Sequence, residues 1–402
     1  MTVANQHDAK VNAGPARQPV WLCGAGAVSG YGWGHKLLVE GLLSGESAAR
    51  LTPGFSPWFE EDSVWVAPIE DGGDRTDGPT RYQRALRHAA RETVHNALDR
   101  GWRPGGVVGM ITGHVLGDVD GWRDFHHRQG LDASKREWLG LMPSTVLSAV
   151  AQEFGFHGPN MAVTAMCAST VAGLLTAQMW IAAGMADDVL VLSADLSITP
   201  ENCAAFNKLG ALFVDAPSLD VCRPFQEGSR GFTAGEAVVG FMVTGRPAGG
   251  YARLLGGAMT HDGFHAISIA PDHDQIFKAF GGALADAGVH PHDIAYVNAH
   301  GTGTRQCDTA EADVLDTMFP AAEGIFSMKP LTGHCQAAAG AVELVASLYG
   351  FERGVIPAPH RVAKGHPRLL DGPTACVEGP IVKSSLGMGG HNAVMVLEAA
   401  NA

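Results

Sequence analysis

Cys167 lies where a short apolar run, Met161–Ala165, gives way to a helical pattern of small side chains, which are Ala168, Ser169, Ala172, Gly173 and Ala177. A helix N-terminus offers unpaired backbone N–H groups and a positive dipole end, which favour a thiolate over a thiol. The segment therefore has two open interpretations. Cys167 is either a nucleophile with a lowered pKa or a buried cysteine that acts as a small hydrophobic residue.

His300 ends the apolar strand predicted at Ile294–Asn298 and opens a loop of glycines and threonines that includes Thr302 and Thr304. Ligand sites form beyond the carboxyl ends of parallel strands, so this position favours a functional site. A lone histidine is more often structural, so His300 gains weight only together with other segments.

Lys329 and His334 share one predicted strand-to-helix turn within Ser327–His334. Glu343 lies in the otherwise apolar part of the helix predicted at His334–Tyr349. It is either a solvated residue or the buried partner of Lys329, and only the second arrangement would make it functional.

Two further segments complete the set of candidates. Leu386–Asn392 is a glycine-rich turn between two predicted strands, and its flexible backbone can bring the N–H of Met388 close to a ligand. Asp308 and Glu311 have the spacing of a capping box at a helix start, so we interpret both as structural.

Short apolar runs alternate with helical patterns along the chain, which predicts an α/β protein with parallel strands. Strands are expected at Pro19–Cys23, Val107–Ile111, Met161–Ala165, Val189–Ala194, Ile294–Asn298, Gly324–Ser327, Ile381–Ser385 and Ala393–Glu398. Helices are expected after Cys167 and at Thr80–Asp99, Asp308–Met318 and His334–Tyr349. A similar order of elements returns after about residue 250, without the repeated letters that would prove a duplication.

Composition excludes several classes of protein. The chain has 402 residues, of which 46% are hydrophobic and 17% charged, enough for a large core. A net charge of −13 argues against nucleic-acid binding. No apolar stretch reaches membrane-spanning length and residues 1–18 lack a secretory core, so we expect a cytoplasmic protein. Its seven cysteines are expected to stay reduced.

Two clusters of charged or metal-ligating side chains allow more than one interpretation. One predicted helix carries four arginines, Arg81, Arg84, Arg87 and Arg91, which form either a docking surface for an acidic carrier protein or, more often in such cases, a solvated helix face. His126 and His127 lie in Gly117–Arg136, which we interpret as an exposed excursion. No cysteine or carboxylate stands at clear ligand spacing from them, so plain surface is favoured over metal binding.

Taken together and in this order, the candidate segments resemble the elongating β-ketoacyl synthases of the thiolase superfamily. The resemblance runs from about Val20 to Glu398 and is also carried by Val20–Gly32, Cys222–Glu236 and Gly333–Glu343. It implies a thiolase-like fold with two similar α/β halves in a five-layer α-β-α-β-α sandwich. The halves are expected at residues 19–249, with the nucleophile, and 250–400, with the histidines, after a flexible tail at 1–18.

In that family, the cysteine that matches Cys167 takes an acyl chain as a thioester. The histidines that match His300 and His334 stabilise an enolate as a malonyl-type thioester loses carbon dioxide, and the carbanion then attacks the acyl-cysteine. The resemblance also implies an oxyanion hole made by the backbone N–H groups of Cys167 and Met388.

Supporting roles follow from the same resemblance. Lys329 and Glu343 match a pair that orders the His334 side, and Thr302 and Thr304 match threonines that hold the donor's pantetheine arm. Substrates are expected on the phosphopantetheine of acyl carrier protein or on coenzyme A, with no other cofactor and no metal. The family further implies a homodimer, or a heterodimer with a related chain, that acts in fatty-acid or polyketide biosynthesis.

Several positions depart from the family pattern. Met388 and Leu386 stand where phenylalanine is common, which suggests an altered acyl-chain pocket or gate. His391 replaces a usual threonine, Met166 replaces a usual alanine, and Gly113–Gly140 departs from a region that lines the pocket and contacts the other subunit.

Other functions stay open beside condensation. An acyltransferase that uses the same cysteine without condensing is the main alternative. A homologue without catalytic activity is a second one, although Cys167 is present. Dinucleotide binding at Gly24–Gly30 is disfavoured, because the third glycine comes one residue late for the fingerprint.

Overall fold

The computed structural model describes residues 18–128 and 134–401. The flexible tail expected at residues 1–18 therefore lies, apart from Gln18, outside the described residues. Within them, no helix is both long and apolar enough to cross a membrane.

Ten strands form two groups of five with the same order and direction. The first group has the order β6-β5-β7-β8-β1 and contains β1 (Val20–Ser29), β5 (Val108–Gly113), β6 (Asn160–Val163), β7 (Asp188–Asp195) and β8 (Ala237–Thr244). The second has the order β11-β10-β14-β15-β9 and contains β9 (Ala252–His261), β10 (Tyr296–Asn298), β11 (Gly324–Phe326), β14 (Ile381–Gly387) and β15 (His391–Ala399). Numbered along the chain, both groups read 3-2-4-5-1.

Strand directions also agree between the groups. The second strand of each group is parallel to its two neighbours, and the fifth is antiparallel to both of its own. The repeat of elements that the sequence suggested is therefore a repeat of topology. Hydrogen bonds between Val20–Leu22 and Ala252–Leu254 join the groups into one continuous path of strands, and the boundary between residues 249 and 250 stays a prediction.

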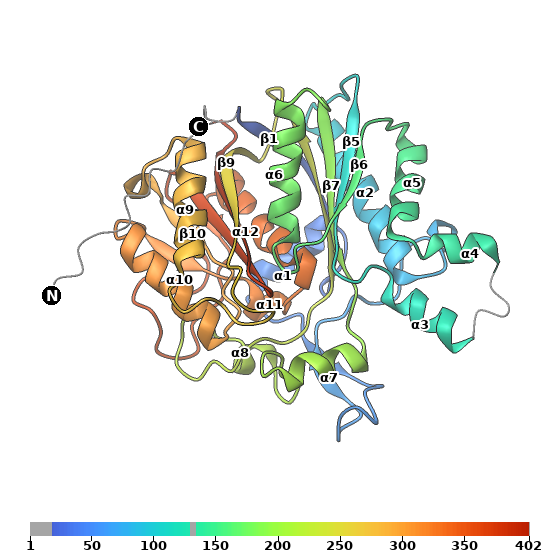
Figure 1. The fold of residues 1–402 in the computed structure, drawn as a ribbon, viewed down its shortest axis with the longest axis horizontal. Coiled ribbons are helices and arrows are strands. Elements are labelled where there is room, and N and C mark those ends of the chain that lie inside the picture. The colour runs from blue at the N-terminus through green and yellow to red at the C-terminus, as the bar shows by residue number, and fades with distance from the viewer. Residues whose placement is uncertain (1–17, 129–133, 402) are drawn as a thin grey trace.

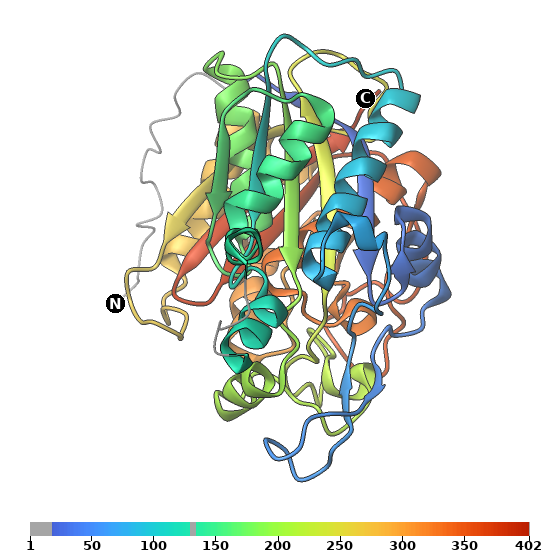
Figure 2. The ribbon, with the colours of Figure 1, turned by 90° about the vertical axis from the view of Figure 1, so that its right-hand side faces the viewer.

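Helices complete the expected five-layer sandwich (Figure 1). The central layer holds α6 (Ser169–Ala182) and α12 (Ala339–Arg353), which contact each other. One outer layer holds α2 (Arg81–Asp99) and α5 (Pro143–Phe154), which lie over the first group of strands in Figure 2. The other holds α9 (Asp274–Ala287) and α10 (Arg305–Met318).

Shorter elements connect these layers. They are β2 (Gly32–Trp33), α1 (His35–Ser44), β3 (Arg50–Thr52), β4 (Val64–Val66), η1 (Arg75–Asp77), α3 (Val119–His127), α4 (Lys135–Gly140), α7 (Pro200–Lys208), α8 (Ser218–Val221), η2 (Pro291–Asp293), α11 (Lys329–Thr332), η3 (Gln336–Ala338), β12 (Val355–Ile356) and β13 (Thr374–Ala375).

The strand expected at Pro19–Cys23 is longer than predicted, because β1 continues through the glycines to Ser29. Its glycines let helix α2 pack directly on the strand. A Cβ on Gly24 would lie 2.5 Å from the Thr93 carbonyl oxygen, and one on Gly26 would lie 2.4 Å from that of Ala89. These glycines therefore serve helix-sheet packing and do not form a nucleotide-binding loop.

The arginines of α2 form neither a docking surface nor a solvated face. Arg84 is 1% exposed and donates to the carbonyls of Gly72 and Pro79. Arg81 pairs with Asp120 and Glu236, and Arg87 and Arg91 pair with Asp77 and Glu153. These side chains are either buried or paired with acidic residues, so they anchor α2 to the surrounding structure.

The expected excursion contains helices α3 and α4. His126 and His127 are exposed at the end of α3, where His126 stacks on Trp122 with ring centroids 6.0 Å apart. Among the described residues, the one group of three close metal-ligating side chains lies elsewhere, at Cys167. The two histidines are therefore surface residues, as the sequence favoured.

Candidate active site

A sharp turn between β6 and α6 presents Cys167 to the interior. Met166, the residue before it, has φ of +50°, a left-handed conformation that costs a non-glycine residue about 1–3 kcal/mol. Ser169 holds the turn in place, since its Oγ accepts from the Ala165 N–H at 2.9 Å and donates to the Met166 carbonyl at 2.6 Å. Strain of this kind persists only where the surrounding structure fixes it. Here the strained turn directs the Cys167 sulfur into the interior.

Burial opposes the lowered thiol pKa that the first of the two interpretations of Cys167 included. Helix α6 begins at Ser169, so Cys167 precedes the helix instead of opening it. Burial raises the pKa of the Cys167 thiol to about 11, against the Lys329 charge and the Met388 backbone N–H, which favour the thiolate. At neutral pH, Cys167 is therefore a protonated thiol next to groups that stabilise its anion.

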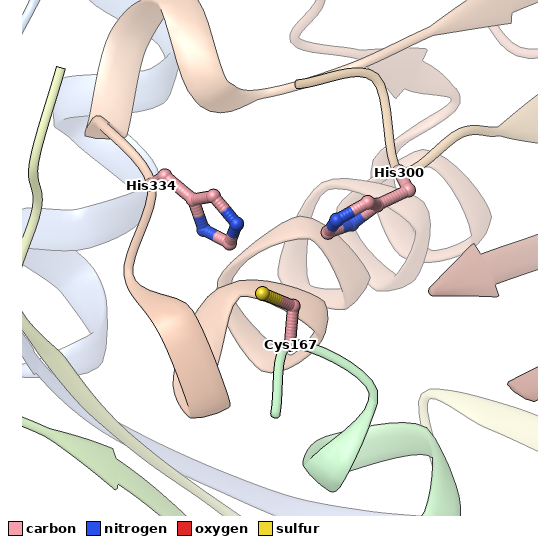
Figure 3. A group of neighbouring side chains, drawn as sticks. All are labelled: Cys167, His300 and His334. Atoms are coloured by element: carbon pink, nitrogen blue, oxygen red, sulfur yellow. The ribbon is translucent and has the colours of Figure 1, made fainter. Parts of the chain in front are cut away.

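Cys167, His300 and His334 converge in a buried cluster (Figure 3). Their ligand atoms all lie within 4.8 Å of one another, and the imidazole centroids are 5.3 Å apart at 77°. The cysteine comes from the first half of the chain and both histidines from the second. The structure thus brings together the three residues that the sequence placed far apart.

A backbone hydrogen bond determines which ring nitrogen of His334 carries the proton. The backbone N–H of Gln336 donates to His334 Nδ1 at 3.1 Å, so the neutral ring carries its proton on Nε2. The Phe232 ring packs edge-on against the His334 ring, with the two ring centroids 4.6 Å apart. Burial, followed by the charges of Lys329 and Lys383, holds the pKa of His334 well below its ordinary value.

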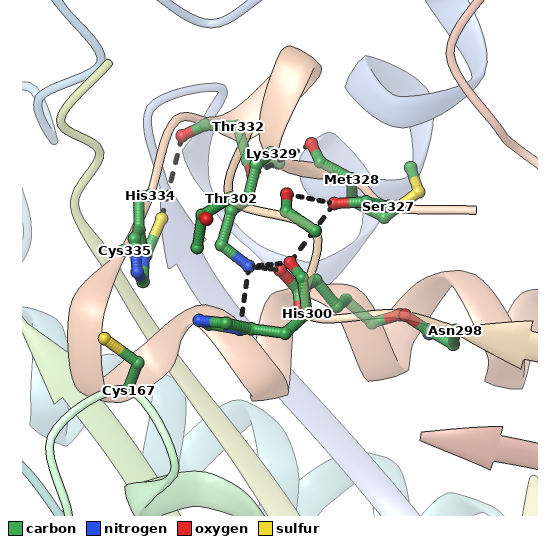
Figure 4. A network of polar contacts seen from close by, with 12 residues as sticks. Cys167, Asn298, His300, Thr302, Ser327, Met328, Lys329, Thr332, His334 and Cys335 are labelled. Carbon is green, nitrogen blue, oxygen red and sulfur yellow. Dashed lines mark hydrogen bonds and ion pairs between the residues drawn. The ribbon is translucent and has the colours of Figure 1, made fainter. Parts of the chain in front are cut away.

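A buried lysine fixes His300 in the same way (Figure 4). The ammonium of Lys329 lies 3.1 Å from His300 Nδ1 and also donates to the His300 carbonyl. Nδ1 accepts, so the proton of this ring is on Nε2 as well. Burial and then Lys329 hold the pKa of His300 well below its ordinary value. Both rings are neutral hydrogen-bond donors.

Glu343 is the buried partner of Lys329 and not a solvated residue. It also lies 2.8 Å from the ammonium of Lys383, a residue that sequence reasoning missed within the strand at Ile381–Ser385. Both lysines are 0% exposed. A lysine inside an otherwise small and apolar strand was the available signal. One carboxylate thus serves two ammonium groups near His300.

Two acids hold the His300 loop, although not by capping. Helix α10 begins at Arg305, and Glu311 accepts from the backbone N–H groups of His300 and Gly301 at 2.8 and 2.6 Å. Asp308 accepts from the N–H groups of Phe225 and Gly303 at 2.8 and 3.0 Å. The structural interpretation of both acids holds, and the capping-box geometry is wrong.

A cavity of about 350 Å³ leads to the cysteine. Thr302 and Thr304 line it, with their hydroxyl oxygens 2.7 Å apart, and so do Leu386 and Met388. All four residues therefore border the space in which a ligand would lie. The expected turn is shorter than the sequence suggested, since β14 extends to Gly387 and β15 begins at His391.

Gln336 is a cavity residue that the sequence analysis did not single out. Its φ is +43°, its N–H donates to His334, and its Oε1 lies 3.7 Å from the Cys167 sulfur. A polar side chain at the start of a buried, small-residue helix was the only sequence signal.

The cluster also has the composition of a three-ligand metal site, since one thiolate and two imidazoles can bind zinc. Such a site would need the thiol deprotonated and a lone pair on each ring nitrogen that faces it. Here both Nδ1 atoms accept hydrogen bonds, which leaves the protons on Nε2. The tautomers favour chemistry in which the rings donate hydrogen bonds.

Comparisons with known proteins agree with this geometry. Residues 75–247 match the family model for the N-terminal domain of β-ketoacyl synthase, and residues 251–362 match that for its C-terminal domain. A 3-oxoacyl-[acyl-carrier-protein] synthase 2 of Staphylococcus aureus (strain COL) is 31% identical over 353 residues, which cover 82% of this chain and 85% of that protein. Nodulation protein E of a Rhizobium species (strain N33) is 33% identical over 54% of each chain.

Solved structures share the whole fold. The ishigamide ketosynthase/chain length factor superposes with a TM-score of 0.82 at 25% identity, covering 96% of this chain and 100% of that one. A ketosynthase in complex with its chain length factor from Xenorhabdus doucetiae gives a TM-score of 0.79 at 22% identity, covering 95% and 98%.

Proposed function

This chain belongs to the β-ketoacyl synthase family, and from that premise we propose that it joins an acyl group on Cys167 to a malonyl-type thioester by decarboxylative Claisen condensation. The observation that carries the proposal is the pair of neutral imidazoles beside one buried thiol. Simple acyl transfer needs a thiol and an oxyanion hole. Two additional N–H donors are needed only where a second anion, an enolate, develops.

The first step loads the enzyme. The Cys167 sulfur attacks the carbonyl carbon of an acyl thioester, and the backbone N–H groups of Cys167 and Met388 stabilise the oxyanion that forms. The bond to the pantetheine sulfur then breaks. The proton that Cys167 loses goes to the departing pantetheine thiol, so the exchange is neutral overall even though burial raises the pKa of Cys167 to about 11.

The second step forms the carbon–carbon bond. The bond between the malonyl carbon and its carboxylate breaks, carbon dioxide leaves, and the electron pair delocalises onto the thioester oxygen. The Nε2–H groups of His300 and His334 donate to that oxygen. The enolate carbon attacks the acyl thioester on Cys167, and collapse of the adduct breaks the carbon–sulfur bond. Cys167 leaves as a thiolate and takes up one proton from solvent, which restores the thiol.

Lys329 is proposed as a positioning residue, because its contact with His300 Nδ1 keeps the ring in the donating tautomer. Thr302 and Thr304 are proposed to hold the pantetheine arm along the cavity that they line. Leu386 and Met388 are proposed to border the acyl chain. Substrates would arrive on phosphopantetheine, and the proposal requires no resident cofactor.

Intact-mass spectrometry tests the proposal. Purified protein is mixed with acyl thioesters and then with malonyl thioester. We expect an acyl adduct on the wild type that is lost in Cys167→Ala. His300→Ala and His334→Ala should retain the adduct but give no extended product. Acylation of Cys167→Ala would refute the nucleophile assignment, and an acyl adduct passed on to another acceptor without condensation would favour the acyltransferase alternative.

We further propose that the protein forms dimers through β6. This strand lies at the end of the sheet, its residues Asn160, Met161 and Ala162 are exposed, and β5 is its only strand neighbour within the described ranges. At the opposite end, β11 is buried. An open edge is a template for pairing with a second strand. Ala162→Pro should give monomers in light scattering, and unchanged dimers would contradict this interface.

The partner is either a second copy or a related chain. One similar solved structure is a ketosynthase in complex with a chain length factor, and another pairs a ketosynthase with an acyl-carrier protein. We propose an acyl carrier protein as the substrate carrier here. We also propose the cytoplasm as the compartment, because all seven cysteines are free.

A further inference from the structure

Arg305 has no ion-pair or hydrogen-bond partner, whereas nearly every other cation in the described part of the chain has one. Among the Lys and Arg side chains that the structure describes, only Lys135, Lys208 and Arg305 have neither an ion pair nor a hydrogen bond. A chain with 41 acidic and 28 basic residues has ample carboxylates to pair its cations. An unpaired arginine in such a chain is free to bind an anion.

Arg305 stands where two hollows meet. It lines the cavity of about 350 Å³ that reaches Cys167, together with Thr302 and Thr304. It also lines a neighbouring hollow of about 450 Å³, together with Gly303 and Lys364. Arg305 is exposed, whereas Cys167 is 5% exposed. A flexible arm that reached from solvent to the sulfur past the two threonines would pass this guanidinium.

Helix stability does not explain the residue. Arg305 is the first residue of α10, where the positive end of the helix dipole disfavours a cation. Asp308 lies in the same turn and lines the same hollow, but its carboxylate accepts from the backbone N–H groups of Phe225 and Gly303 and makes no ion pair with Arg305. The position is electrostatically unfavourable unless an anion joins it.

We propose that Arg305 binds the phosphate of the phosphopantetheine arm that carries the substrates. This inference rests on the proposed function and extends it to the outer end of the arm. Guanidinium groups bind phosphate oxygens through paired N–H donors, and an exposed arginine can do so without displacing another partner. The threonines would hold the middle of the arm, and Arg305 its charged end.

The test compares acyl-pantetheine with acyl-4′-phosphopantetheine as donors, in acylation of Cys167 followed by intact-mass spectrometry. The wild type should be acylated roughly tenfold faster, in kcat/KM, by the phosphorylated donor, the size of one hydrogen bond to a charged group. Arg305→Ala should lose this preference and keep its rate with acyl-pantetheine. Arg305→Lys should keep part of it.

Lys208→Ala is the matched control. Lys208 is also unpaired and directly precedes Leu209 and Gly210, which line the same cavity, but it does not line the cavity itself. It should keep the full phosphate preference. Equal losses in Lys208→Ala and Arg305→Ala would show general attraction of anions and overturn the proposal, as would an unchanged preference in Arg305→Ala.

Two further donors distinguish the sources of the phosphate. Acyl-coenzyme A and acyl carrier protein carry the same phosphopantetheine, so Arg305→Ala should slow both. Slowing with coenzyme A alone would assign Arg305 to the nucleotide and contradict the proposal. Failure of every donor to acylate the wild type would refute the proposed function, whereas acylation without a phosphate effect would refute only the role of Arg305.

Discussion

Glu343 is the only carboxylate within ion-pair distance of Lys329 and Lys383 among the described residues, and the three side chains are almost completely buried. Glu343→Gln keeps the shape of the side chain but removes the charge. Two ammonium groups then remain in the interior without a counter-anion. Breaking a buried ion pair by removal of one partner costs about 3–5 kcal/mol, and here one carboxylate serves two cations. We therefore expect a loss of at least about 3 kcal/mol in the free energy of unfolding.

The pH dependence provides a second readout. Burial alone lowers the pKa of Lys329, and Glu343 reverses this so that the folded pKa is raised. Without Glu343, both lysines should have folded pKa values below those of the unfolded chain. The unfolded state then binds more protons, so the variant should gain stability as pH rises toward about 10 and lose it as pH falls.

Guanidinium chloride unfolding at pH 7 and pH 9 measures both effects. Glu40→Gln is the control, because it makes the same substitution in the exposed pair with Lys36, whose side chains are 86% and 56% exposed, and should cost about 0.5 kcal/mol or less. A loss below about 1 kcal/mol in Glu343→Gln, with the pH dependence of the wild type, would refute the assignment of Glu343 as a shared buried counter-anion.

Three more perturbations follow from the geometry. Alkylation of Cys167 by iodoacetamide should accelerate about tenfold per pH unit from pH 7 to pH 9.5, because burial raises the thiol pKa to about 11, and a plateau below pH 8 would contradict this. Gly387→Ala should abolish acylation, since its Cβ would lie 2.6 Å from the Ala165 carbonyl oxygen, whereas Gly281→Ala, with no atom within 4 Å, should be stable and active. Arg84→Ala should lower the free energy of unfolding by about 2–4 kcal/mol through loss of its buried hydrogen bonds, and exposed Arg75→Ala by less than about 0.5 kcal/mol.

The sequence predicted those features of the fold that depend on residues close together in the chain. The apolar runs gave strands within a few residues of β5, β7, β10 and β14, and the small residues after Cys167 do let the start of α6 lie in the core. The order of the cysteine, the two histidines and the lysine carried the family resemblance. Those residues meet in space because of how the two groups of strands are arranged. No local sequence pattern contains that arrangement.

Properties set by distant partners escaped the sequence. Arg87 and Arg91 of α2 are paired with Asp77 and Glu153, which the packing of η1 and α5 on α2 brings close. The raised thiol pKa follows from burial of Cys167, which outweighs the Lys329 charge and the Met388 backbone N–H. Lys383 is unusual in its strand, but its role depends on Glu343, which lies 40 residues earlier in the chain.

The central claim is that two neutral imidazoles, each with its proton on Nε2, face the thiol of Cys167. Nitrogen-15 NMR of histidine-labelled protein measures this directly, with the signals assigned by their loss in His300→Ala and His334→Ala. At pH 7, both rings should show a protonated Nε2 and an unprotonated Nδ1, and both should remain neutral at a pH where an ordinary exposed histidine is already protonated, because burial lowers both pKa values. A proton on Nδ1 of either ring, or an imidazolium at pH 7, would contradict the account.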